Sequence, residues 1–471
     1  MTLYPLETSA SFFGSGSSDY DAQTVANTRG ELVAIYSTDD GSSRGNAWAR
    51  YSTDSGVTWS SRTALLSNAT AANGIISKST AVMWEWSLRV KDDILYMVFH
   101  GHPGATTRLW FSKCDISRAS NITVFSNWKS ANNTAVPSSG NATNGSGIDY
   151  LDSASGFIDP SVAVRATNDI TVLAIQTTAS PRVYAMRWNG TSWSSPAIVI
   201  RNPTGNGVGL WKLWYSDQAG WVASGPMVGT DRKNYIAAAK ASPGADTTSS
   251  ANWTKFAGSA GQDTIISQQT SASFDSWPMG GILADGAQCI FACVSSNVVE
   301  AAFYRAYWNR WSGATWIHGT DQNTAGTIVS FSTAAVQEPR PIQGPRSMAI
   351  SMEPGGQARM FLSANNGPSG AGLYQLDYRA ATRSWEAASY RKFQLASGDS
   401  VGNAGQWTEQ FGADAEATYV VGMVSMASAV YIARTGAASG NPYWQATFRR
   451  RSDDFEVYES GPRRGRIAIR G

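Results

Sequence analysis

Residues 51–61, YSTDSGVTWSS, place an aromatic residue, Trp59, at the end of a short segment of turn-forming residues. Similar segments recur along the chain around Trp128, Trp193, Trp253, Trp316, Trp385 and Phe455. These seven markers stand 60–70 residues apart and fill the chain. An even period of this length indicates a repeat architecture.

The same order of segments surrounds each marker. In the first repeat, an apolar run (31–37, ELVAIYS) is followed by an aromatic-bearing run (46–52, NAWARYS), the marker and a short apolar run (63–67, TALLS). A further candidate strand ending in turn residues precedes the first run, as in 160–166, PSVAVRA. No sustained helical period is present. The pattern predicts an all-β fold, a seven-bladed β-propeller of four-stranded antiparallel blades with the marker between the third and fourth strands.

The predicted boundaries follow from this period. Residues 1–18 form an N-terminal extension or closing strand, and 19–471 form a single propeller domain. The expected blades are 19–68, 80–136, 157–201, 208–258, 273–331, 342–396 and 414–470. Either residues 3–13 add a strand to the last blade, or the first and last blades pack together without it. The alternative, several β-sandwich domains in series, does not explain an even period.

The composition limits the function classes. The chain has 471 residues, a formal net charge of +2, and 15% charged and 11% aromatic residues, which gives no broad attraction to nucleic acid or anionic membrane. No secretory signal is visible, and no stretch of eighteen apolar residues predicts a membrane span. We interpret Cys114, Cys289 and Cys293 as buried free thiols. The last two stand about 13 Å apart if their segment is extended, whereas a disulfide needs Cα atoms within about 7 Å.

The opening stretch resembles the Asp box, or BNR repeat, of sialidase-like propellers. The defining positions of that motif are Ser52, Asp54, Gly56, Thr58 and Trp59. The other markers keep the aromatic residue but not the aspartate. The full motif is therefore present in one blade, and the other blades share only the regular spacing of the aromatic residue. It implies a structural corner, in which Asp54 accepts backbone N–H groups, Gly56 adopts positive φ and Trp59 packs on the neighbouring blade.

The binding site is expected at the opposite end of the blades. There the second strand connects to the third, and the fourth strand connects to the first strand of the next blade. The latter connections (66–80, 134–157, 258–274, 320–337 and 396–412) are long and polar, and such loops commonly carry binding residues. The predicted ligand-binding residues are Trp84, Trp86, Trp211, Trp214, Trp277, Arg340, Arg346 and Trp407. The alternative for each tryptophan is packing between blades.

The resemblance also allows a test for catalysis. Sialidases of this fold use three arginines, a Tyr–Glu nucleophile pair and an acidic Asp, and two of the arginines should fall near Tyr20-Asp21 and near Asp39, where this chain has none. A glycoside hydrolase would instead draw its carboxylates from Asp159, Asp275 and Glu338. His100 and His102 lack a third metal ligand at fixed spacing, so neither a metal nor a cofactor is expected.

These observations favour a non-enzymatic propeller that binds a cell-surface glycan or receptor. The composition is similar to that of bacteriophage tail fibres and spikes, which predicts synthesis in the cytoplasm and a place on a virion or other particle surface. Two basic segments, 448–454 and 461–471, would then dock onto other virion proteins. The alternatives are a sialidase-like glycoside hydrolase acting on surface polysaccharide and a structural decoration module.

Overall fold

The fold is described from a computed structural model. It describes residues 3–7, 22–39, 45–54, 58–66, 81–103, 108–137, 142–152, 156–176, 182–201, 211–228, 234–267, 279–282, 289–297, 303–318, 326–332, 348–352, 358–367, 370–379, 384–385, 391–393, 406–407, 420–426, 429–435, 446–451, 454–459 and 466–468. Apart from three short 3-10 helices, η1 (Ala119–Thr123), η2 (Phe125–Asn127) and η3 (Ser250–Asn252), the regular elements of these residues are β-strands. None of the helices in these residues is long and apolar enough to span a membrane. The all-β prediction is confirmed.

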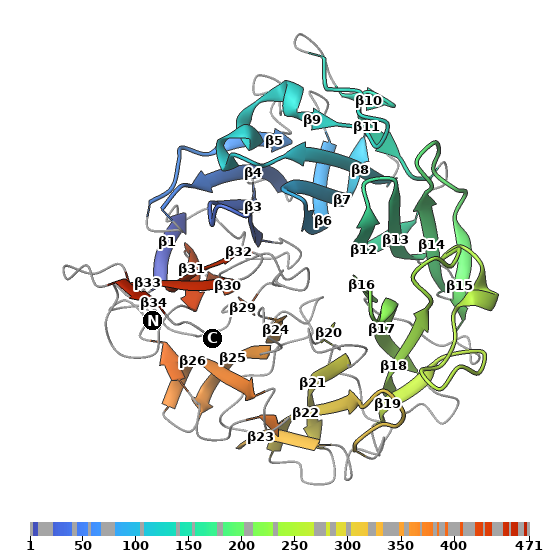
Figure 1. Cartoon of the computed structure of the whole chain (residues 1–471), viewed down its shortest axis with the longest axis vertical. Coiled ribbons are helices and arrows are strands. Elements are labelled where there is room, and N and C mark those ends of the chain that lie inside the picture. The colour runs from blue at the N-terminus through green and yellow to red at the C-terminus, as the bar shows by residue number, and fades with distance from the viewer. Residues whose placement is uncertain are drawn as a thin grey trace.

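The described strands form eight sheets, and in four of them four strands pair antiparallel in chain order (Figure 1). Seven are numbered here as sheets 1 to 7. Sheet 1 contains β2 (Ala22–Ala26), β3 (Leu32–Asp39), β4 (Gly45–Ser52) and β5 (Thr63–Leu66). Sheet 2 contains β6 (Ala81–Lys91), β7 (Ile94–Pro103), β8 (Arg108–Asp115), β9 (Trp128–Lys129), β10 (Thr143–Asn144) and β11 (Gly147–Tyr150). Sheet 3 contains β12 (Phe157–Ala166), β13 (Asp169–Gln176), β14 (Arg182–Trp188) and β15 (Ala197–Arg201).

The remaining sheets come from the second half of the chain and its N-terminal strand. Sheet 4 contains β16 (Lys212–Ser216), β17 (Gly220–Val228), β18 (Asn234–Ala241) and β19 (Asp263–Ser267). Sheet 5 contains β20 (Met279–Ile282), β21 (Cys289–Asn297), β22 (Phe303–Trp311) and β23 (Gly326–Ser332). Sheet 6 contains β24 (Met348–Met352), β25 (Ala358–Gly367), β26 (Gly370–Arg379), β27 (Ser384–Trp385) and β28 (Arg391–Phe393). Sheet 7 contains β1 (Leu3–Glu7), β29 (Gln406–Trp407), β30 (Val420–Met426) and β31 (Ala429–Thr435). The C-terminal sheet contains β32 (Ala446–Arg451), β33 (Asp454–Glu459) and β34 (Arg466–Ala468).

The numbered sheets succeed one another in chain order around a common centre (Figure 1). The first strands of neighbouring sheets contact one another, from β2 to β6, β12, β16, β20 and β24, and β24 contacts both β29 and β30. Strand β30 also contacts β2. The first strands therefore line the centre, and the later strands of each sheet lie toward the periphery.

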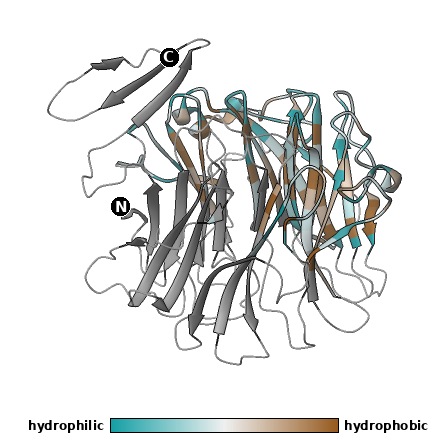
Figure 2. Ribbon diagram, turned by 60° about the horizontal axis from the view of Figure 1, so that its bottom comes forward, coloured by the Kyte–Doolittle hydropathy of each residue, from teal (hydrophilic) through white to brown (hydrophobic). Residues whose placement is uncertain are grey.

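The hydrophobic core lies between consecutive sheets. Along β7, Leu95, Met97 and Phe99 belong to the cluster shared with sheet 1. The intervening Tyr96 and Val98 belong to the cluster shared with sheet 3. Because successive strand residues point to opposite faces, sheet 2 buries both faces, and the clusters on either side of sheets 3 and 4 show the same for those sheets. Figure 2 shows hydrophobic residues along the described strands and hydrophilic residues in the turns at one end.

The N-terminal strand completes sheet 7. Leu3 is paired with Ala433 in the antiparallel β1–β31 ladder, so β1 occupies the edge of β31 that a fourth strand of the same repeat would take. The predicted interval 414–470 accordingly divides between sheet 7 and the C-terminal sheet, and the marker Phe455 lies within β33 rather than in the connection after a third strand. The expected addition of N-terminal residues to the last sheet is thus present for residues 3–7.

Sheet 2 departs from the expected strand positions. Its fourth position is held by β11, in which Asp149 pairs with Phe111 of β8. The apolar run 133–136 was expected to fill that position, and β10 and β11 fall inside the predicted connection 134–157. The run instead lies in the connection between β9 and β10, where Val136 N–H donates to the Trp128 carbonyl at 2.9 Å.

The tryptophan markers lie at equivalent places. Each follows the third strand of its sheet and precedes the outer strand, as is true of Trp59, Trp128, Trp193, Trp253, Trp316 and Trp385. The ring of Trp193 meets Phe111 of sheet 2 at a centroid distance of 5.0 Å, and that of Trp316 meets Phe256 of sheet 4 at 5.1 Å. The predicted packing of marker rings on a neighbouring sheet is confirmed at these corners.

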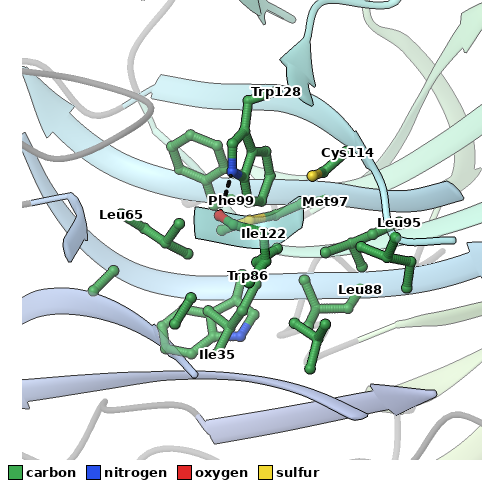
Figure 3. Close-up of a cluster of buried hydrophobic side chains, with 14 of the residues drawn as sticks. Ile35, Leu65, Trp86, Leu88, Leu95, Met97, Phe99, Cys114, Ile122 and Trp128 are labelled. Atoms are coloured by element: carbon green, nitrogen blue, oxygen red, sulfur yellow. Dashed lines mark hydrogen bonds between the residues drawn. The ribbon is translucent and has the colours of Figure 1, made fainter. Parts of the chain in front are cut away.

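The corners of sheets 2 and 4 have the same construction, each based on an Asn–Trp pair. The side-chain N–H groups of Asn127 and Trp128 donate to carbonyls six residues earlier, at 3.1 and 3.0 Å. Asn252 and Trp253 repeat both bonds at 2.9 Å. Figure 3 shows Trp128 and its bond to Ile122 within the core between sheets 1 and 2.

The corners of sheets 3 and 5 have a second type of construction, a turn closed by a side-chain oxygen. Asn189 Oδ1 accepts N–H groups two and three residues later at 2.9 and 3.0 Å. Ser312 Oγ accepts the equivalent groups at 3.3 and 3.0 Å. The glycines that follow, Gly190 and Gly313, have φ of 94° and 100°, which favours glycine at both positions. These two local designs therefore present a tryptophan at the same corner.

Candidate functional site

The first strands of sheets 2, 3 and 4 are joined by a repeated hydrogen bond. Ser87 Oγ on β6 accepts the Val162 N–H of β12 at 3.1 Å, and Ser161 Oγ on β12 accepts the Leu213 N–H of β16 at 2.9 Å. Ser87 and Ser161 are therefore equivalent positions on adjacent strands. This relation sets the alignment of the three strands at the centre of the molecule.

Asp159 lies two residues before Ser161, near the start of β12 and away from the turn that joins β12 to β13. Its φ is 50°, and the ladder between β12 and β13 shifts register between Ile158 and Ser161. A β-bulge changes the direction in which a side chain points. A non-glycine residue with a positive φ lowers the stability of the folded state by roughly 1–3 kcal/mol. The structure thus holds a partly buried carboxylate in a strained backbone at the end where the long polar connections lie.

Glu85 lies on β6 two residues before Ser87, the same sequence spacing that separates Asp159 from Ser161. It stands opposite His100 in the ladder between β6 and β7, beside a second shift of register. In the ladders Glu85 is level with Ile158, because His100 and Ile175 each stand two residues beyond the partner of the equivalent serine and Ile175 pairs with Ile158. The bulge therefore sets Asp159 between the paired positions, and the two acidic residues lie near the same end of adjacent first strands. The sequence analysis missed Glu85 because it lies in an aromatic run, although aligning 84–87 (WEWS) with 158–161 (IDPS) would have paired it with Asp159.

A buried arginine lies deeper in the same strands. Arg89 is 3% exposed, and its Nη2 donates to the Leu213 carbonyl of β16 at 3.1 Å. It follows Glu85 by four residues, or roughly 13 Å of extended strand. The guanidinium is always charged, so it sets a positive charge beneath the two acidic positions.

Three of the predicted ligand-binding tryptophans lie in the core. Trp86, Trp211 and Trp214 are 2%, 1% and 5% exposed. The ring of Trp211 lies so close to Gly225 that a Cβ there would meet it at 2.3 Å. These rings pack between sheets and leave no face open for stacking on a sugar.

The other predicted site residues are not placed together by the described part of the chain. Trp84 and Trp407 lie in β6 and β29, and ligand contact by their side chains stays a prediction. The remaining residues, Asp275, Trp277, Glu338, Arg340 and Arg346, lie outside the described residues, as does Gly56.

The segment resembling an Asp box forms the corner between β4 and β5. Asp54 accepts the Thr58 N–H at 2.9 Å and the Thr58 hydroxyl at 2.6 Å, and Ser52 Oγ donates to it at 2.7 Å. Burial alone would raise the pKa of Asp54, but the hydrogen bonds from Thr58 and Ser52 outweigh it and lower the pKa. The expected backbone bond to this carboxylate is confirmed, and the corner lies at the end of the sheet away from Asp159.

Two further features bear on chemistry. Cys114 and Cys289 are buried free thiols, as expected, whereas the side chain of Cys293 is not described. Among the described residues, no group of three or more His, Cys, Asp or Glu side chains is arranged to hold a metal ion.

No family model and no curated protein matches this sequence. The solved structure of polysaccharide lyase Uly1 is 10% identical, with a TM-score of 0.52, and the match covers 92% of this chain and 93% of that one. The BP39L lectin from Burkholderia pseudomallei is 12% identical over 90% of this chain and 97% of its own, with a TM-score of 0.48. The Hadza microbial sialidase Hz136 is 11% identical over 89% and 66%, with a TM-score of 0.39. At 10% identity the likeness to the lyase shows a shared fold alone, and the two lower scores carry no argument.

Proposed function

We propose that the protein is a seven-bladed β-propeller that binds a glycan, without turning it over, at the end of the blades where Asp159 and Glu85 stand. The blade count is supported by the contacts that run from each first strand to the next and from β30 back to β2. It is also supported by the addition of β1 to sheet 7. Sheets 1 to 7 are then the blades, and the first of them carries an Asp box.

The strained carboxylate of Asp159 is the observation that carries the binding site. Carboxylates accept the hydroxyl groups of sugars, and a backbone conformation that costs stability is retained where it serves a purpose. Glu85, near the same end of the adjacent first strand, would give a second acceptor. The similarity of fold to a polysaccharide lyase supports a carbohydrate as the ligand class.

A glycan array followed by a turnover assay tests this proposal. We expect the wild-type protein to bind a defined glycan and to release neither reducing ends nor unsaturated sugars from it. Asp159→Asn and Glu85→Gln keep the size of each side chain and should each weaken binding by about tenfold, as for loss of one charge-assisted hydrogen bond. Binding left unchanged in both variants would contradict this site.

Catalysis is the second candidate, because the sheet end that holds Asp159 and Glu85 has two carboxyl groups, as many as glycoside hydrolysis needs. Turnover in the wild type that is lost in Asp159→Asn would replace the binding proposal with an enzyme. If the glycan array detects no binding and the turnover assay detects no product, the alternative of a structural decoration module is favoured.

We further propose that recognition takes place on the surface of a virion or other particle. The polar, lysine-poor composition supports this location, and co-sedimentation of the protein with intact particles tests it. A protein found only in the soluble fraction would contradict it.

A further inference from the structure

The C-terminal sheet is not needed to complete sheet 7. Strand β1 takes the position next to β31, so sheet 7 has four strands without any residue after Thr435. The strands β32, β33 and β34 contact one another, and none of them contacts a described strand of sheets 1 to 7 to a comparable extent. The C-terminal sheet is therefore an addition to the repeat pattern, and its role is distinct from that of the seven numbered sheets.

One face of the C-terminal sheet is apolar at its centre. Phe448 pairs with Val457, and Val457 pairs with Ile467, so these three residues form one row across the three strands. Directly opposed residues of antiparallel strands share a face of the sheet. Phe455 lies on the same face as Val457, because residues two apart in a strand share a face. A sheet with one apolar face is stable when another layer covers that face.

The opposite face carries charges that are mostly balanced within the sheet. Arg449 stands opposite Glu456, and Arg451 stands opposite Asp454. Opposed residues of unlike charge stabilise a pair of strands. Arg466 on β34 adds one further positive charge to this face. The charges of this face are thus largely matched within one chain, which favours the apolar face as the one that meets a partner.

The apolar face also carries one basic and one acidic residue, and they stand at opposite ends of it. Arg450 pairs with Phe455 at one end of β32, and Glu459 pairs with Ala446 at the other end. Four residues of extended strand, or about 13 Å, separate these two ladder positions, so the two charges are not neighbours within one chain. A second copy turned end to end over this face would place its Glu459 at Arg450. A two-fold axis makes this match twice, because a symmetric interface pairs the same two residues in both directions.

We propose that the C-terminal sheet is the contact between two copies of this chain, which pack apolar face to apolar face about a two-fold axis across the strands. The row of Phe448, Val457 and Ile467 fills the centre, and an ion pair between Arg450 of one copy and Glu459 of the other closes each end. Three strands about 4.8 Å apart and up to six residues long cover roughly 15 Å by 20 Å, well below the ~800 Å² per partner of a standard interface. The dimer should therefore dissociate on dilution. The proposal is independent of the glycan site.

Sedimentation of the full chain over a range of protein concentrations tests the proposal. We expect the wild type to pass from monomer to dimer as its concentration rises. Phe448→Glu places a charge at the centre of the apolar face and should abolish the dimer. Thr447→Glu makes the same kind of change one residue away, on the opposite face, and should leave the dimer intact. A wild type that stays monomeric up to about 1 mM, or equal association of the two variants, would overturn the proposal.

Charge reversal separates association from a general loss of folding. Arg450→Glu leaves acidic residues at both ends of the apolar face, and Glu459→Arg leaves basic residues at both ends. Each variant alone should dimerise about tenfold more weakly, because both ion pairs become repulsive. An equimolar mixture of the two variants should recover wild-type dimerisation, since every acidic end then meets a basic end. Failure of the mixture to recover it, or a trimer or larger assembly of the wild type, would overturn the proposal.

Discussion

The indole Nε1 of Trp193 donates a hydrogen bond of 3.1 Å to Oδ2 of Asp149, joining the corner of sheet 3 to strand β11 of sheet 2. The same carboxylate oxygen accepts the Ala131 N–H at 2.7 Å, and Lys113 Nζ donates to the Ala131 carbonyl at 2.9 Å. Trp193, which the repeat period predicted as a marker, is thus hydrogen-bonded to Asp149. Asp149 lies in β11, a strand that the repeat period did not predict.

Asp149 should make stability fall as pH rises. Burial raises its pKa above 3.8 despite the hydrogen bonds from Ala131 and Trp193. Its stabilising contribution is therefore full below the unfolded value and is lost as pH rises through the folded value. Asp149→Asn keeps an acceptor for both donors and removes this dependence. Denaturant unfolding from about pH 4 to about pH 7 should show the variant gaining stability relative to wild type.

Asp246→Asn is the control for that experiment. A hydrogen bond from the Thr248 hydroxyl is the main cause that lowers the pKa of Asp246, so its contribution is lost as pH falls and the difference from wild type takes the opposite sign. Parallel curves for wild type and Asp149→Asn would contradict the assignment.

Gly225→Ala should destabilise the protein by about 2 kcal/mol or more, because a Cβ would meet the indole of Trp211 at 2.3 Å and a packed core cannot make room cheaply. Gly244→Ala is matched in chemistry but meets nothing within 4 Å, and it should leave stability unchanged. Chemical denaturation of the two variants side by side gives the answer. Equal stability would show that Trp211 is not fixed against β17.

The Asn–Trp corners should each contribute measurable stability. Asn127→Ala and Asn252→Ala remove a side-chain bond to a carbonyl six residues earlier, and each should cost about 1 kcal/mol. Ser126→Ala, at an exposed neighbouring position, should be neutral. Because the corners lie in different sheets, the double variant should show additive losses. A neutral result at both asparagines would mean that the tryptophans alone form the corner.

Asp159→Gly should separate stability from binding. Glycine adopts positive φ without strain, so the free energy of unfolding should rise by about 1 kcal/mol while glycan binding is lost. Asp92→Gly is the matched control, since Asp92 also has a positive φ of 53° but lies in the turn at the other end of the sheet. It should stabilise the protein and leave binding intact. Loss of binding in both variants would point to a global effect.

Much of the fold was predictable because a sheet that buries both faces, as sheets 2, 3 and 4 do, imposes a repeating pattern on the chain. The all-β class, the tryptophan corners and the backbone bond to Asp54 follow from local spacing and turn chemistry. The placement of β11 was not predictable, since a strand as short as Gly147–Tyr150 in a polar segment gains its stability from pairing with β8. The core positions of Trp86 and Trp211 were not predictable from the sequence either, because an indole ring can pack in a core or stack on a sugar equally well.

The sequence by itself determined the period, the strand order within sheets 1 and 3 to 5, and the corner at Asp54, since these depend on residues close together in the chain. Tertiary structure alone decided that β1 joins β31, that Ser87 and Ser161 link adjacent first strands, and that Glu85 and Asp159 lie near the same end of those strands. Such relations join residues far apart in the chain, and they exist only once packing between sheets has fixed the register of one first strand against the next.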